Sequence, residues 1–108
     1  MPKYLFMGSY NRDGLQGLVK DGGSRRREVA ARAIESVGGK LDEFYFAFGE
    51  SDVVGIADLP DNVSAAALSV AISSAGAFAY RTTVLLTPEE MDRAVRKGAE
   101  ITYTPPGR

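Results

Sequence analysis

The first strand-like segment of the chain, from Tyr4 to Tyr10, carries apolar side chains on both of its faces. Side chains alternate across a strand, which places Tyr4, Phe6 and Tyr10 on one face. Leu5 and Met7 then lie on the opposite face. A sheet that contains this strand needs an apolar cover on each side, so one layer of helices is not a sufficient cover.

Segments with helical spacing and segments with strand-like composition alternate along the rest of the chain. The first helical region is expected to begin at Gly14, to be interrupted at Gly22-Gly23 and to end at Gly38-Gly39, with Ser24 as the N-cap of its second half. Further strands are expected at 40–48, 52–58 and 78–86, with an uncharged helix from about Asp61 to Ala75 between the last two.

The expected strand at 40–48 is also apolar on both faces. Strict alternation predicts that one face carries Phe44, Phe46 and Phe48 and the other carries Leu41, Tyr45 and Ala47. A tight connection at Gly49-Glu50-Ser51 then leads into the strand at 52–58, which makes these two strands a hairpin.

The sequence Thr87-Pro88-Glu89-Glu90 is the clearest local signature in the chain. Thr87 can accept the backbone N–H of Glu90 while Glu90 reaches back, and Pro88 needs no donor in the first turn. This capping box predicts a short last helix that ends at Gly98. Residues 1–100 then form a single domain, and residues 101–108, with Pro105-Pro106-Gly107, form an extended tail.

The predicted order of elements is β-α-β-β-α-β followed by a C-terminal helix. Two βαβ units joined by a hairpin give an α+β fold of the ferredoxin-like type, a four-stranded antiparallel sheet with helices on one face. The other face exceeds the largest apolar patch of a usual monomer, ~300–600 Å². A second copy of the sheet can cover it, so we predict a homodimer with the two sheets packed face to face. Further subunit contacts through the uncharged helix give a higher oligomer as an alternative.

Composition excludes several classes of site and partner. Histidine, cysteine and tryptophan are absent from the 108 residues, which excludes disulfides, Cys or His metal ligands, haem held by His and the serine–histidine–acid triad. We therefore expect neither a metal nor a cofactor. The formal net charge of −1 argues against nucleic acid as a partner. With no secretory signal and only a mediocre hydrophobic stretch at 62–80, we expect a soluble, cytoplasmic protein that does not bind membranes.

An ordered series of short motifs is similar to a known family over almost the whole chain. The motifs are Met1-Pro2-Lys3-Tyr4, Gly14, Gly38-Gly39-Lys40-Leu41 before Phe44-Tyr45, Gly49-Glu50-Ser51-Asp52-Val53-Val54, Leu59-Pro60-Asp61 and Arg81-Thr82-Thr83. In these residues the chain resembles the GYD-domain proteins, small bacterial and archaeal members of the dimeric α+β barrels. The resemblance implies the fold and a dimer, but no substrate, because the family is largely without an assigned activity.

The family takes its name from a motif that usually has glycine, any residue, tyrosine and aspartate. Gly49 and Asp52 match this motif, whereas Ser51 stands where the tyrosine is typical. The departure at Ser51 means that no role of the motif tyrosine carries over to this chain.

Three charged residues are candidates for catalysis. Asp52 and Glu50 lie near a strand end, where an acid–base pair forms if an apolar pocket raises one pKa. The alternative, which we favour, is that Asp52 accepts backbone N–H bonds and fixes the hairpin. Arg81 can clamp a carboxylate or phosphate. It can also pair with Asp52 or Asp58, or lie at the subunit interface, and we favour such structural pairing.

The candidate ligand-binding residues form two groups, together with Arg81. Tyr10 and Asn11, followed by Arg12, are the first choice for the mouth of a pocket. Arg25 and Arg26 lie at a helix start whose free N–H groups attract anions. The alternative is a solvated charge run balanced by Asp21 and Glu28. Four strand tyrosines can line the pocket or serve as core or interface residues: Tyr4, Tyr10, Tyr45 and Tyr80.

These features lead to three hypotheses for function. The leading one is a homodimeric barrel that binds a small organic molecule, anionic ones included, between sheet and helices. The second is a protein-interaction or regulatory module without catalysis. The third, by analogy with related barrels, is a cofactor-free enzyme. A cavity of about 300 Å³ or more with converging polar groups favours ligand binding, whereas a filled core favours the interaction module.

Overall fold

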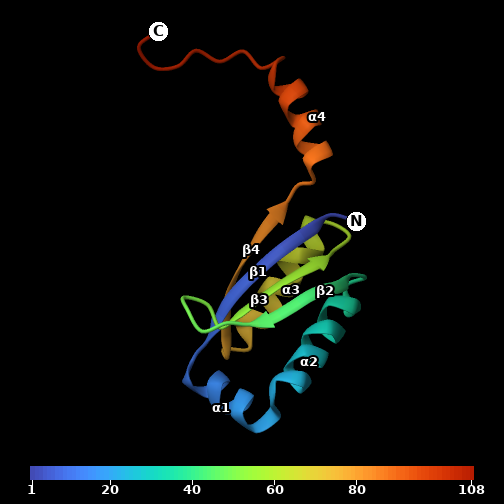
Figure 1. Cartoon of the computed structure of the whole chain (residues 1–108), viewed down its shortest axis with the longest axis vertical. Coiled ribbons are helices and arrows are strands. Elements are labelled where there is room, and N and C mark those ends of the chain that lie inside the picture. Colours follow the sequence, from blue (N-terminus) through green and yellow to red (C-terminus); the bar gives the residue numbers. More distant parts are fainter.

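Four antiparallel strands form one sheet in the order β2-β3-β1-β4 (Figure 1). The computed structural model describes residues 1–108, so the whole chain is covered. Its elements are β1 (Lys3–Tyr10), α1 (Arg12–Asp21), α2 (Gly23–Ser36), β2 (Lys40–Phe46), β3 (Val53–Asp58), α3 (Asn62–Ser74), β4 (Phe78–Leu85) and α4 (Pro88–Gly98). The fold is α+β and ferredoxin-like, as the order of sequence segments predicted.

One face of the sheet is covered by α2 and α3 and contains the core. α2 packs on β2 and α3 packs on β4, which are the two edge strands. Tyr4 of β1 is only 2% exposed and lies at the centre of the buried cluster. The other buried members of this cluster are Ile34, Leu41, Ala57, Leu59 and Ala65.

The helix caps follow the sequence signals in two places and depart from them in one. Asp61 accepts the N–H of Ser64 at the start of α3, and the Thr87–Glu90 capping box opens α4. The expectation that Ser24 caps α2 is wrong. Gly22, with φ of 83°, turns the chain between α1 and α2, and α2 already begins at Gly23. A chain reversal that only glycine adopts easily replaces the side-chain cap there.

β2 is shorter and less regular than the alternation of its residues predicted. The strand ends at Phe46, and Phe48 is fully exposed in the connection to β3, so Phe48 does not share a face with Phe44. A β-bulge between Leu41 and Glu43 inserts one extra residue, Asp42. Because a bulge shifts the alternation by one position, Leu41 points to the helices and not to the opposite face.

The opposite face of the sheet carries no helix (Figure 1). Leu5 and Met7 of β1 lie there beside Ile56 and Val54 of β3, and all four are only half-buried. At one end of this face Lys3 pairs with Asp42 and with Asp58, the latter at 2.9 Å. We call this surface the open face. Its centre is apolar, as the sequence predicted for the uncovered side, and the Lys3 ion pairs lie at its margin.

α4 and the tail extend beyond the sheet, at the end where β4 stops (Figure 1). No residue of α4 is buried, and Met91 and Val95, four positions apart on one helix face, are 49% and 66% exposed. The radius of gyration is 17.3 Å, against about 13 Å for a compact chain of this length. Residues 101–108 contain no helix or strand.

The uncharged α3 is 13 residues long, and the chain contains no helix with the length and apolarity needed to cross a bilayer.

Candidate ligand-binding site

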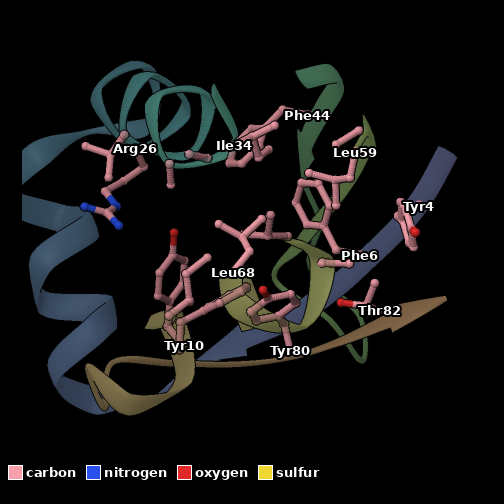
Figure 2. Close-up of a pocket in the computed structure, with 18 residues that line it drawn as sticks. Tyr4, Phe6, Tyr10, Arg26, Ile34, Phe44, Leu59, Leu68, Tyr80 and Thr82 are labelled. Carbon is pink, nitrogen blue, oxygen red and sulfur yellow. The ribbon is translucent and has the colours of Figure 1, made fainter. Parts of the chain in front are cut away.

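An inner cavity lies between the helix-covered face of the sheet and the helices α2 and α3 (Figure 2). Its volume is about 120 Å³, and 16 of its 18 lining residues are hydrophobic. An engineered apolar cavity of about 150 Å³ in another protein admits one benzene molecule. The inner cavity is therefore close to the size of one aromatic ring.

An open groove of about 510 Å³ continues from the inner cavity between α2 and α3. The two spaces share seven lining residues: Tyr10, Arg26, Val29, Ala33, Leu68, Ile72 and Phe78. The inner cavity alone falls below the 300 Å³ expected of a ligand site, whereas the groove exceeds it. The two together form one continuous, mainly apolar space that reaches the surface.

The space between the helices and the sheet remains open because the residues that face it from the helices are small. Ala30 and Ala33 on α2 and Ala65 on α3 present only methyl groups to the cavity. Gly55 of β3 lies beneath the Phe6 ring, and a Cβ there would come closer than 3.0 Å to the ring carbons. The cavity thus results from small residues on the helices facing aromatic rings on the strands.

Two tyrosines inside the cavity differ in how their hydroxyls are satisfied. The Tyr4 hydroxyl donates to Asn62 Oδ1 at 2.7 Å. The Tyr80 hydroxyl is buried and has no hydrogen-bond partner. Burial raises the pKa of Tyr80 above its ordinary value of 10.0; the Ser69 and Thr82 hydroxyls are close enough to lower it, but neither completes a hydrogen bond. Tyr80 therefore stays a protonated phenol at neutral pH.

The three residues expected at a pocket mouth have different surroundings in the structure. Tyr10 lines both the inner cavity and the groove, and Figure 2 shows its hydroxyl on the side of Arg26. Asn11 caps α1 by accepting the N–H of Gly14 at 2.9 Å and donates to the carbonyl of Gly76. Arg12 is exposed at the start of α1. Of these three residues, Tyr10 is the one in contact with the space.

The two candidate arginines at the start of α2 also differ in their surroundings. Arg26 lines the cavity and the groove, and its Nη1 lies 3.5 Å from the Asp21 carboxylate. Arg25 points elsewhere and pairs with Glu28 at 3.5 Å. Arg26 is thus the one charged side chain that lines the inner cavity, at its groove end (Figure 2).

The two acidic candidates, Asp52 and Glu50, lie outside the cavity. The Asp52 carboxylate accepts the backbone N–H of Tyr10 at 2.9 Å, and its own N–H donates to the carbonyl of Gly8. The backbone carbonyl of Glu50 accepts the Ser9 hydroxyl. Asp52 therefore ties the end of β1 to the start of β3. No group of three or more acidic side chains gathers to hold a metal ion.

Arg81 and Tyr45 lie on the open face, away from the cavity. Arg81 stands opposite Met7 in the β1–β4 register, is exposed, and forms no ion pair with Asp52 or Asp58. The Tyr45 hydroxyl donates to Glu43 at 3.0 Å, and this hydrogen bond raises the pKa of Tyr45. The structure thus separates Arg81 from Tyr10 and Arg26.

Sequence reasoning included Tyr80 among four equivalent tyrosines and gave no role to Thr82, which also lines the cavity. Residues 78, 80 and 82 alternate along β4 and so share the face that the helices cover. The alternation could have placed these side chains together. The lack of a partner for the Tyr80 hydroxyl depends on how α3 packs on β4, so the sequence of β4 alone could not predict it.

Comparison with known proteins supports the family and leaves the activity open. A search of curated protein sequences finds no match to this chain. The GYD domain profile matches residues 4–95, which includes the four strands apart from Lys3, the cavity and most of α4. With that match over most of its length, the chain belongs to the GYD domain family.

Proposed function

We propose that this protein binds a small, mainly apolar organic molecule in the inner cavity and the groove between α2 and α3. The observation that carries the proposal is the continuity of the two spaces through seven shared residues. Ligand sites are usually concave, mainly apolar and fitted with a few polar groups. Here the polar groups are the hydroxyls of Tyr10, Tyr80 and Thr82 and the guanidinium of Arg26.

Binding of benzene, followed by NMR of the backbone amides, tests this proposal. We expect benzene to shift the resonances of Leu68, Ile72 and Phe78, because these residues line both spaces. Ala33→Phe places a ring in the shared part of the space and should abolish these shifts. Ala66→Phe, on an exposed position of α3 outside both spaces, is the matched control.

Two results would contradict the proposal. One is the absence of any benzene-dependent shift in the wild-type protein. The other is a response of Ala33→Phe equal to that of the wild type, because benzene would then bind elsewhere. Native mass spectrometry of protein purified from its own host adds a direct measurement, since a retained ligand appears as added mass.

We also propose that the protein is a homodimer in which the open faces of two sheets pack together. The support is the half-buried apolar centre of that face, with Leu5, Met7, Val54 and Ile56, which no element of the same chain covers. Arg81 would then lie at the subunit interface. Sheets that pack face to face bury such residues in ordinary folds.

The projecting α4 supports the same assembly. Its exposed side chains Met91 and Val95 need an apolar partner, because an isolated helix of 11 residues is marginal in water. Only Leu86 and Thr87 separate β4 from α4, and the capping box at Thr87 fixes the start of the helix. This short connection favours contact with a second copy over a return to the same sheet.

Sedimentation velocity tests the homodimer. Met7→Glu places a charge at the centre of the open face, and we expect it to convert the dimer to a monomer. Val19→Glu adds the same charge on α1, where Val19 is 86% exposed, and should leave the dimer unchanged. A wild-type monomer, or a Met7→Glu dimer, would contradict the proposal.

A further inference from the structure

The inner cavity, proposed above as a ligand site, has a distinct distribution of charge. Its 18 lining residues include no acidic side chain, and Arg26 is their one cation. Figure 2 shows Arg26 at the α2 side, away from Tyr80 and Thr82. A charged ligand group beside Tyr80 would therefore be buried without a counter-charge, which is unfavourable. The inner end of the cavity selects an uncharged group.

The Tyr80 hydroxyl gives this inner end a buried polar group without a hydrogen-bond partner. It is buried and has no partner, although Ser69 and Thr82 lie close to it. Because its pKa is raised by burial, the phenol keeps its proton and can donate it in a hydrogen bond. A ligand that offers an acceptor here would satisfy a group that the protein leaves unsatisfied.

The walls of the cavity favour a flat ring. The Phe6 and Tyr80 rings meet edge to face, with centroids 6.4 Å apart. Phe78 stacks near Tyr80 with centroids 5.8 Å apart, and Tyr10 lies 4.8 Å from Phe78. Aromatic pairs prefer these edge-to-face and offset arrangements, and an aromatic ligand can extend them. The volume of about 120 Å³ limits the buried part to about one ring.

We infer that the ligand is an uncharged one-ring aromatic compound bearing a hydrogen-bond acceptor, of the aryl carbonyl class, with the acceptor at the Tyr80 hydroxyl. This inference rests on the proposed ligand-binding function and adds the chemistry of the ligand. A substituent too large for the inner cavity would lie in the groove, which Arg26 also lines.

Two probes of nearly the same shape test the inference. Acetophenone carries a carbonyl oxygen where α-methylstyrene carries a methylene carbon, so the two differ mainly in the acceptor. We expect the wild-type protein to bind acetophenone about fivefold more tightly, as one added hydrogen bond implies. The dissociation constants are measured by NMR titration of the cavity amides.

Tyr80→Phe removes only the hydroxyl and should make the two dissociation constants equal. Tyr45→Phe removes a hydroxyl from the open face and should preserve the preference for acetophenone, which makes it the matched control. The comparison of the two probes in the wild-type protein is independent of both variants, so it remains decisive if Tyr80→Phe fails to fold.

The outcomes separate this inference from the proposed function. Equal binding of both probes at the cavity overturns the acceptor inference and supports the ligand site. A preference for acetophenone that survives Tyr80→Phe also overturns it, because another donor would then be responsible. Failure of benzene and both probes to bind contradicts the proposed function and the inference together.

Discussion

Gly55 of β3 pairs with Phe6 of β1, and the Phe6 ring lies over the glycine where a side chain would otherwise stand. The same ring lines the inner cavity. The shape of the cavity therefore depends on a residue that contributes no side chain to it.

Gly55→Ala should destabilise the fold and displace the Phe6 ring. An added Cβ would meet three ring carbons closer than 3.0 Å, and overpacking of this kind costs about 1–3 kcal/mol. Urea denaturation measures the loss in the free energy of unfolding. Gly17→Ala on α1 is the control: a Cβ there meets nothing within 4 Å, so we expect a small gain of about 0.5–1 kcal/mol. Equal behaviour of the two variants would show that Phe6 moves without cost.

Two tyrosine-to-phenylalanine changes should have opposite effects on the unliganded protein. Tyr4→Phe removes a hydroxyl that donates to Asn62 at 2.7 Å, and it should lower the free energy of unfolding by about 1 kcal/mol. Tyr80→Phe removes a buried hydroxyl without a partner, so stability should stay the same or rise. Thermal and chemical unfolding of both variants provide the measurement. A loss at Tyr80 as large as that at Tyr4 would mean that its hydroxyl is already satisfied.

The cap of α3 should weaken in acid. The hydrogen bond from the Ser64 backbone lowers the pKa of Asp61 below its ordinary value of 3.8, so the folded state binds this proton less readily than the unfolded state. The stabilisation is complete above pH 3.8 and is lost as the pH falls through the lower folded-state pKa. Asp61→Asn keeps an acceptor but does not titrate. We expect the protection factor of the Ser64 amide, which corrects its exchange rate for the intrinsic effect of pH, to fall in acid more in the wild type than in this variant, and an equal fall would refute the role of the charge.

Removal of residues 87–108 should weaken self-association without unfolding the sheet. α4 contributes no buried residue to its own chain, so the shortened protein should still unfold cooperatively. Loss of the Met91 and Val95 contacts to a partner should raise the dimer dissociation constant at least about tenfold. Sedimentation equilibrium over a concentration series measures this change. An unchanged dissociation constant would show that α4 takes no part in the dimer.

Local signals in the sequence predicted the parts of the fold that local chemistry determines. The Thr87–Glu90 capping box and the Asp61 cap each involve residues three positions apart, so a short stretch of sequence contains the whole interaction. Ser24 failed as a cap because the positive φ of Gly22 starts the helix two residues earlier. The glycine pair was visible, but the direction in which it turns the chain was not.

Features that depend on pairing between distant segments were not predictable in the same way. The bulge that turns Leu41 inward arises from the register of β2 against β3. The separation of Arg26 from Arg25 depends on which face of α2 meets the sheet. The Tyr80 hydroxyl is buried without a partner only when β1, β4 and α3 are packed together. Composition and spacing could therefore single out Tyr80 as a candidate, but could not predict that its hydroxyl lacks a hydrogen bond.

The bulge at Asp42 has a further consequence for self-association. It interrupts β2, which is a free edge of the sheet, and an irregular edge is a poor template for another strand. Open-ended addition of chains along that margin is thereby discouraged. A sheet with an apolar face and an irregular edge strand is therefore a poor seed for fibrils.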